Sequence, residues 1–292
     1  MEDFKAYLIN ECHKADNTVI AYMRDIGAFE KFLKTRGDKT LLQCRDSDAI
    51  AYVYALSNDN KSKATINRKI SSIRAYYDYE IGEGNLESNP FSDIKSTRND
   101  KRDIEFLTLD EVEALLEAPD ESPKGLRDRA LLEYMYGTGA RVTEVVRLTF
   151  RDMNLRMDIT TCKDGKGEGR IVPIGTYAHK ALMKYINQAY NAIKGDIRSE
   201  DDYVFINFRG RPLTRQGIWK ILKEYGRQIG IEDKMTPQIL RDTFAVHMLQ
   251  NGADLKSLQE LMGFEDMSVG IAYLSVLKVR IRDVYKKTHP RA

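Results

Sequence analysis

The chain has 292 residues, of which 42% are apolar and 31% are charged, and its formal net charge is +2. This length suits one large domain or two ordinary domains. No apolar run approaches the roughly 18 residues that cross a membrane, and the N-terminal residues lack the basic–apolar–small order of a signal peptide. Cys12, Cys44 and Cys162 are scattered and odd in number, which predicts a reducing cytoplasm, no disulfide framework and no metal site.

Residues 1–95 predict a small, all-helical domain. Apolar residues recur there at helical spacing in three stretches, 18–33, 49–56 and 64–79. Residues 92–106 are polar and aperiodic, so we place a linker at 96–106 and a second domain at 107–292.

The second domain begins with helical patterns. Thr108 and Glu111 form a capping box that opens its first helix, and helices are then expected at 126–135, 142–148 and 177–192. Thr214 caps a further helix, in which Trp219 is expected to lie in the core rather than to serve as a base-stacking platform.

A strand signal interrupts these helices. Residues 159–162 and 170–174 are short, β-branched segments separated by Gly165, Gly167 and Gly169, which predicts a β-hairpin, and residues 203–206 carry a second strand signal. The glycine–lysine–glycine turn is not a phosphate-binding P-loop, because the GxxxxGK[ST] spacing and the following helix are absent.

The last third of the chain predicts three short helices in succession. Thr236 and Pro237 open the first helix with a hydroxyl cap and a proline at its first position, and Asn251-Gly252 ends it. The second helix spans about 254–263. The third begins near residue 268 and carries Tyr273.

Basic residues gather locally in this nearly neutral chain, which suits a protein that contacts phosphates on one side, although a solvated face explains any single stretch equally well. Residues 276–292 are also strongly basic and predict an amphipathic C-terminal helix. The candidate phosphate contacts are Lys61, Lys63, Arg68, Lys69, Arg74, Arg209, Arg211 and Arg215.

Three sequence segments carry a family resemblance: TGARVTEVVRL at 138–148, GKG followed by an R-x-VP strand at 165–173, and LRDTFAVHMLQNGADLKSLQELMGFEDMS followed by IAY. Together they resemble the tyrosine recombinases, the phage integrase family, and most closely their Xer branch. The resemblance spans nearly the whole chain. It implies a mainly α protein with two domains, an all-helical, SAM-like core-binding domain and a helical catalytic domain with a small β-sheet, which close on DNA as a C-shaped clamp.

The resemblance implies a role for four residues in DNA cleavage. Arg141 and Arg241 would hold the non-bridging oxygens of the phosphodiester, because guanidiniums donate paired hydrogen bonds and stay charged. Tyr273 would be the nucleophile that forms a 3′-phosphotyrosine, and Lys166 would protonate the leaving 5′-oxygen. Neither a metal nor another cofactor is required. Tyr285 is a rival phenol, but Tyr273 has the family's spacing from position 264.

The chain departs from the family pattern at three positions. Gln238 occupies a place where the family usually has histidine or lysine, and Phe264 one where it usually has histidine or tryptophan. Asp242 follows Arg241 where histidine is frequent. Glutamine can donate a hydrogen bond to a phosphate but cannot take a proton, and phenylalanine offers no donor. We therefore expect an active but slow enzyme, with a non-catalytic DNA-binding relative as the alternative.

The expected partner is a double-stranded DNA recombination site, bound by a homo- or hetero-tetramer whose protomers interact through the C-terminal tail helix. The sequence leaves open whether a second recombinase or a DNA translocase takes part. Chromosome or plasmid dimer resolution is the first functional hypothesis, favoured by the compact length and the HPRA ending. An integrase of a mobile element, with the same chemistry, is the second.

Overall fold

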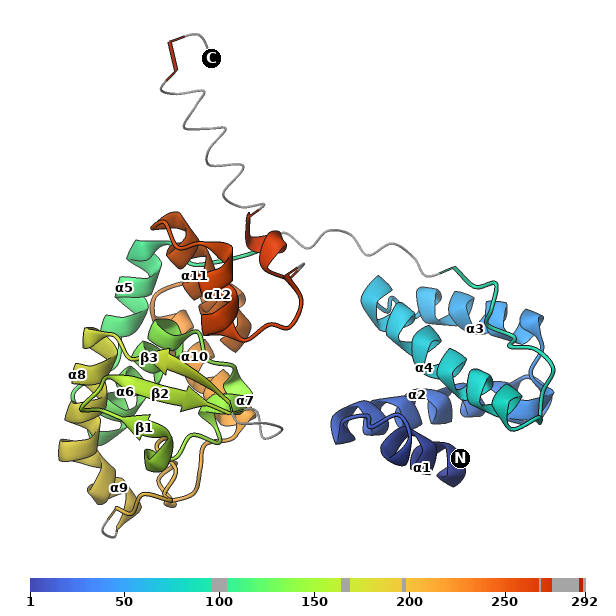
Figure 1. The fold of residues 1–292 in the computed structure, drawn as a ribbon, viewed down its shortest axis with the longest axis horizontal. Helices are drawn as coiled ribbons and strands as arrows, with labels where there is room; N and C mark the ends of the chain where they lie inside the picture. Colours follow the sequence, from blue (N-terminus) through green and yellow to red (C-terminus); the bar gives the residue numbers. More distant parts are fainter. Residues whose placement is uncertain (96–103, 164–168, 196–197, 268, 275–288, 291–292) are drawn as a thin grey trace. The chain divides into compact units, whose positions relative to one another are not determined.

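The structure, a computed structural model, describes residues 1–95, 104–163, 169–195, 198–267, 269–274 and 289–290. The chain forms two compact units, Met1–Arg102 and Asp103–Ala292 (Figure 1). Lys166, Tyr285 and nearly all of the expected tail helix lie outside the described residues. Among the residues that are described, no helix is long and apolar enough to cross a membrane.

The described part of the first unit is helical. Its helices are α1 (Glu2–Asn10), α2 (Asp16–Thr35), α3 (Asp46–Asn58) and α4 (Lys63–Gly82), with a 3₁₀ turn at Leu41–Gln43. The helical stretches expected from periodicity lie inside α2, α3 and α4. Helix α1 was not predicted, because its buried stripe consists only of Phe4 and Leu8, which is too short to show a period.

Aromatic rings fill the centre of this first unit. Phe29 of α2 is fully buried and contacts Tyr52 and Phe91 at ring-centroid distances of 4.8 and 5.2 Å. Tyr77 of α4 is also fully buried, and its hydroxyl donates to the carbonyl of Leu41 at 2.8 Å. The buried hydroxyl is therefore satisfied, which keeps the tyrosine compatible with an apolar core.

Several basic residues of the first unit are engaged inside it. Asp25 of α2 has no exposed surface and binds Arg68, Lys69 and the hydroxyl of Ser72, the last at 3.1 Å. A buried carboxylate needs such partners, since its isolated charge is costly away from water. Arg74 donates from Nε to the carbonyl of Phe91 at 2.9 Å.

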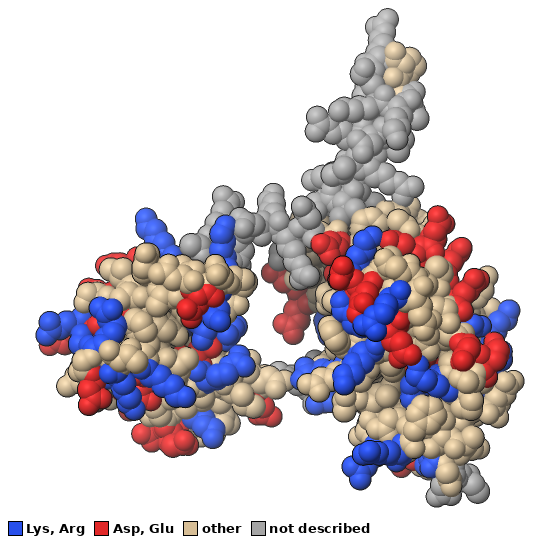
Figure 2. All heavy atoms as spheres, turned by 180° about the vertical axis from the view of Figure 1, so that it is seen from behind, with Lys and Arg blue, Asp and Glu red and all other residues tan. Residues whose placement is uncertain are grey.

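Lys61 and Lys63 are exposed, unlike the three basic residues just described. On the face seen in Figure 2, basic and acidic side chains are interspersed over both units, in keeping with the small net charge. On that face, a phosphate-binding surface would therefore be local rather than continuous.

The second unit is mainly helical, and its small sheet is buried on one face and exposed on the other. Its helices are α5 (Leu109–Glu117), α6 (Pro123–Thr138), α7 (Val142–Val145), α8 (Thr176–Tyr185), α9 (Asn191–Lys194), α10 (Arg215–Gln228), α11 (Pro237–Gln250) and α12 (Leu255–Met262). A π-helical turn at Ile186–Tyr190 joins α8 to α9, so the expected helix 177–192 is continuous but irregular. Short 3₁₀ turns occur at Phe150–Asp152 and Glu232–Lys234.

The sheet is three-stranded and antiparallel, in the order β1-β2-β3, with β1 at Met153–Asn154, β2 at Ile159–Cys162 and β3 at Arg170–Pro173. The expected hairpin is present as β2 and β3. The strand expected at 203–206 was wrong, because its described residues form only two isolated bridges, Thr149–Tyr203 and Ile206–Pro212. Its apolar run reflects burial in the core instead.

The expectation for Trp219 was also wrong. This side chain on α10 is 46% exposed, and the Lys223 ammonium lies 5.4 Å from its ring centroid. The buried face of α10 consists of Ile218, Ile221, Leu222 and Tyr225. Trp219 follows Ile218 directly and so lies about 100° around the helix from it, at the edge of that face.

We predict that Asp25→Ala lowers the free energy of unfolding of the first unit by about 2–3 kcal/mol, because charged partners lose a buried acceptor. Calorimetry of the full chain measures the change. Glu30→Ala on the same helix is the control, since Glu30 forms a solvent-exposed pair with Lys34 and such pairs contribute little. Equal losses in the two variants would contradict a structural role for Asp25.

Candidate active site

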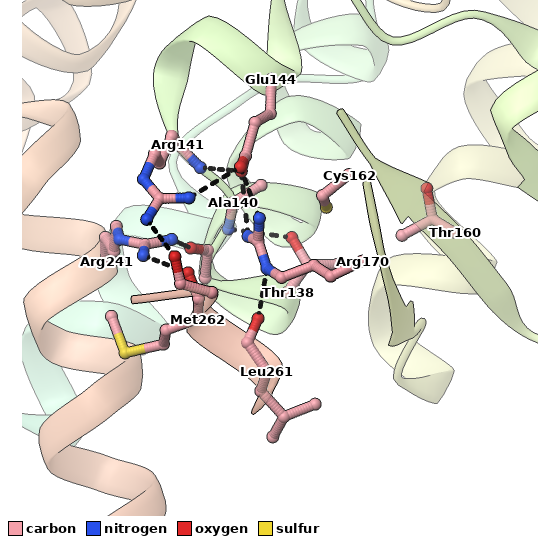
Figure 3. A network of polar contacts seen from close by, with 12 residues as sticks. Thr138, Ala140, Arg141, Glu144, Thr160, Cys162, Arg170, Arg241, Leu261 and Met262 are labelled. Atoms are coloured by element: carbon pink, nitrogen blue, oxygen red, sulfur yellow. Dashed lines mark hydrogen bonds and ion pairs between the residues drawn. The ribbon is translucent and has the colours of Figure 1, made fainter. Parts of the chain in front are cut away.

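Three arginines from separate elements meet in the second unit (Figure 3). Arg141 lies between α6 and α7, Arg170 lies on β3, and Arg241 lies on α11. Helix α6 ends at Gly139, whose φ of +59° turns the chain so that Arg141 can begin α7. A side chain at Gly139 would meet the ring of Phe244 at 2.5 Å, so the backbone approach also requires glycine.

All three guanidiniums bind the carboxyl-terminal end of α12. Arg170 Nε donates to the carbonyl of Leu261 at 2.6 Å, Arg241 Nη2 donates to that of Met262, and Arg141 Nη2 donates to that of Gly263 at 2.5 Å. The last carbonyls of a helix have no intrahelical partner and carry partial negative charge. The arginines therefore satisfy this helix end and are held by it.

Glu144 is the carboxylate of this cluster. It is 3% exposed and binds both Arg170, with Nη2 to Oε2 at 2.9 Å, and Arg141, with Nη1 to Oε1 at 3.0 Å. Burial would raise the pKa of Glu144, but its hydrogen bonds and ion pairs with Arg170 and Arg141 hold that pKa below its usual range. Glu144 is therefore ionised, and it orients two arginines at once.

Arg241 has no carboxylate contact among the described residues; its other hydrogen bond goes to the carbonyl of Gly139. Burial, together with repulsion from Arg141 and Arg170, lowers the pKa of Arg241 to about 10. The guanidinium thus stays charged near neutral pH. Three cations facing one carboxylate leave a local surplus of positive charge, which an anion would relieve.

Tyr273 lies in the helical segment 269–274 and is 6% exposed. Its hydroxyl donates to Asp242 Oδ1 at 2.7 Å, and Gln238 Nε2 donates to the same oxygen at 2.8 Å. Burial, followed by the hydrogen bond to Asp242, raises the pKa of Tyr273. The phenol is therefore neutral at rest and must lose its proton if it is to attack an electrophile.

Phe264 packs beneath the nucleophile candidate. It is 8% exposed and belongs to a buried cluster with Tyr273. A side chain at Gly270 would come within 2.9 Å of the Phe264 ring, so the helix that carries Tyr273 lies directly against that ring. His247 is also buried, and its Nδ1 lies 2.9 Å from the hydroxyl of Tyr136. These contacts are those of a packing residue.

The structure thus brings together Arg141, Arg241, Gln238, Phe264 and Tyr273, whereas Lys166 lies outside the described residues. Sequence reasoning did not single out two members of the cluster, Glu144 and Arg170. Glu144 stands three residues after Arg141, where it accepts from the Arg141 backbone N–H at 2.6 Å. That spacing at a helix start was an available signal, while Arg170 was visible only as part of the strand pattern.

The basic residues near α10 are exposed. Asn207 Oδ1 accepts from the backbone N–H groups of Arg209 and Arg211 at 2.8 and 3.2 Å, which leaves both guanidiniums on the outside of a turn. Arg215 begins α10 and is exposed as well. These positions are compatible with contacts to a charged backbone.

Residues 105–280 match the profile described as the phage integrase family, and residues 1–84 match that of the phage integrase N-terminal SAM-like domain. The tyrosine recombinase XerD of Listeria monocytogenes is 40% identical, over 100% of this chain and 99% of that protein. The tyrosine recombinase XerC of Bacillus subtilis is 37% identical, over 99% and 95% of the two chains.

A solved structure of the XerH site-specific recombinase, bound to its palindromic difH substrate in a post-cleavage complex, is similar in fold. The TM-score is 0.74 at 19% identity, and the similarity covers 96% of this chain and 83% of that one.

We predict that Glu144→Gln lowers the free energy of unfolding by about 3–5 kcal/mol, because the partly buried Arg141 and Arg170 lose their buried carboxylate. Since the folded pKa of Glu144 lies below the unfolded value of about 4.3, its stabilisation is fully present above that value. It is lost as the pH falls through the lower, folded pKa. Denaturation of wild type and variant at about six pH values between roughly 3 and 8 measures the difference. The control is Glu260→Gln, which changes an exposed carboxylate on α12.

We predict that Gly263→Ala destabilises the second unit by about 1–3 kcal/mol and disturbs the arginines. Gly263 has φ +61°, and a Cβ there would lie 2.8 Å from Arg170 Cδ. Gly252→Ala is the matched control, because Gly252 also has positive φ, +95°, but nothing within 4 Å of an added Cβ. A loss at Gly252 as large as that at Gly263 would assign the effect to backbone strain alone.

Proposed function

The chain belongs to the phage integrase family and is an Xer-like, site-specific tyrosine recombinase, and on that premise we propose how its residues cleave and rejoin DNA. The observation that carries the proposal is the positively charged cluster of Figure 3, of which Arg141 and Arg241 act electrostatically on the buried Tyr273. The other two hypotheses, a mobile-element integrase and a non-catalytic DNA-binding relative, are not favoured by the relatives.

Arg141 and Arg241 bind the scissile phosphate. A phosphodiester resists attack because its charge repels nucleophiles, and its pentavalent transition state carries more charge on the non-bridging oxygens. Arg141 is the accessible member, with a side chain 37% exposed, and Arg241 is the buried one. Their hydrogen bonds to Gly263 and Met262 hold both guanidiniums before DNA arrives, so little reorganisation is needed.

Tyr273 attacks the phosphorus and becomes joined to the 3′ end of the broken strand. The 5′-hydroxyl leaves with a proton, for which Lys166 is the proposed donor. Because the phosphotyrosine retains the energy of the phosphodiester, a second 5′-hydroxyl can attack it and restore a continuous strand. Neither cleavage nor rejoining consumes a nucleotide or needs a metal ion.

Gln238 and Phe264 adjust this site rather than perform the chemistry. The amide of Gln238 donates a hydrogen bond and can do so to a phosphate, while Phe264 supports the helix of Tyr273 through packing. Loss of one preorganised donor typically costs about 10²–10³ in rate. The replacements therefore make cleavage slower than it would be with two histidines.

The proposed substrate is a double-stranded recombination site in the cytoplasm, and the proposed role is resolution of chromosome or plasmid dimers. The N-terminal unit contributes Lys61 and Lys63, which are exposed, to a C-shaped clamp around the duplex. Arg209, Arg211 and Arg215 are the corresponding contacts of the catalytic unit. Four protomers assemble on two duplexes through the tail at residues 276–292, with a second recombinase or a DNA translocase as candidate partners.

We predict that Tyr273→Phe abolishes covalent attachment to DNA and leaves non-covalent affinity nearly unchanged, because only the reacting oxygen is removed. The probe is a nicked suicide duplex carrying a site selected by the protein from random duplexes, and the readout is a covalent band on a denaturing gel. Tyr285→Phe is the matched control and should retain the band. A band that survives in Tyr273→Phe would refute the assignment of the nucleophile.

A further inference from the structure

We propose that Asp242 is the general base that removes the proton from the Tyr273 hydroxyl during cleavage and returns it during rejoining. This inference rests on the proposed function, since it concerns the nucleophile of that reaction. It adds a catalytic residue at a position where the family frequently has histidine.

The geometry places the carboxylate on the reacting atom. Asp242 follows Arg241 on α11 and is half-buried, and its Oδ1 accepts the hydroxyl proton of Tyr273 at an oxygen–oxygen distance of 2.7 Å. A general base must lie within about 2.6–3.2 Å of the atom that it deprotonates. Gln238 Nε2 donates to the same Oδ1 at 2.8 Å, which orients the carboxylate toward the tyrosine.

The other residues at the usual histidine positions cannot take this proton. The Gln238 amide is not basic near neutral pH, and Phe264 has no titratable group. His247 is turned toward Tyr136, to which its Nδ1 is bonded. Among the described residues, Asp242 is therefore the basic group in contact with the Tyr273 hydroxyl.

The proton balance of cleavage closes with this assignment. A bond forms between Tyr273 Oη and phosphorus while the bond between phosphorus and the 5′-oxygen breaks. The phenol proton moves to Asp242 Oδ1, and the 5′-oxygen takes a proton from the general acid, for which Lys166 is proposed. In rejoining, the attacking 5′-hydroxyl gives its proton back to the proposed general acid as it forms a bond to phosphorus. The bond between phosphorus and Tyr273 Oη breaks, and Asp242 gives its proton to the departing Tyr273 oxygen, so every group returns to its starting state.

A carboxylate is ordinarily a weak base, so the surroundings of the phenol matter as well. Tyr273 faces Asp242 from the segment 269–274, Arg241 and the neutral Gln238 share the helix of Asp242, and Arg141 and Arg241 act electrostatically on Tyr273. The two guanidiniums act on the phenol: their positive charge favours the phenolate of Tyr273 and so assists transfer of its proton to Asp242.

The test is single-turnover formation of the covalent complex on the nicked duplex by Asp242→Asn. Asparagine keeps the shape and an acceptor oxygen for the Tyr273 hydroxyl but cannot take a proton. We expect cleavage to be slower by about 10²–10⁴ with unchanged non-covalent DNA affinity and melting temperature. Asp233→Asn, which alters an exposed aspartate in the turn before α11, is the control and should cleave at the wild-type rate.

Two further readouts separate proton transfer from positioning. Formate should restore part of the cleavage rate of Asp242→Ala, whose shortened side chain leaves room for it, and should not help Tyr273→Phe. The rate of Asp242→Asn should continue to rise with pH, because hydroxide must then remove the phenol proton, whereas the wild-type rate levels off. A merely structural role for Asp242 would produce neither result.

Cleavage by Asp242→Asn within about threefold of wild type, far below the loss expected of a general base, would overturn the inference. Faster cleavage by that variant would overturn it too, since the carboxylate would then restrain the nucleophile. In both cases the wild type still forms its Tyr273-dependent covalent complex, so the proposed function survives. Absence of that complex in the wild type would instead overturn the proposed function and this inference together.

Discussion

The carboxyl-terminal end of α12 is the constraint on which the site depends. Its last carbonyls bind guanidiniums from β3, α11 and the start of α7, so one helix end fixes three segments that are far apart in the sequence. Arginine suits this position because its several donors can bind a carbonyl and still point toward a substrate. Glycine at 263 is needed because the turn has positive φ and Arg170 lies against it.

The same turn also connects the phosphate-binding groups to the nucleophile. Gly263 is followed by Phe264, which packs against the helix that carries Tyr273. A displacement of α12 would therefore move the arginines and the tyrosine together. The three arginines and the attacking oxygen are therefore held in place by the same turn. Glu144 stabilises the arginine cluster by offsetting part of the repulsion among its cations.

Sequence reasoning predicted most of the fold but only part of the site. Long amphipathic helices were visible because their buried stripes span several turns, whereas α1 and the two-residue strand β1 are too short to show a period. The family segments indicated Arg141, Arg241 and Tyr273 as candidates. They did not indicate which oxygens hold the guanidiniums, because carbonyls carry no residue-type signal and contacts between distant segments leave no local pattern.

Asp242 illustrates why a departure from a family pattern has to be interpreted in three dimensions. Taken one at a time, Gln238, Asp242 and Phe264 each appear as the loss of an imidazole. In the structure the first two act together, since the amide orients the carboxylate and the carboxylate contacts the tyrosine. The positive charge of Arg241 and Arg141 acts on the phenol and favours its ionised form, so the arginines and the carboxylate both assist loss of the proton. The replacement therefore puts a carboxylate, oriented by its own helix neighbour Gln238, on the attacking oxygen at a position where the family frequently has an imidazole.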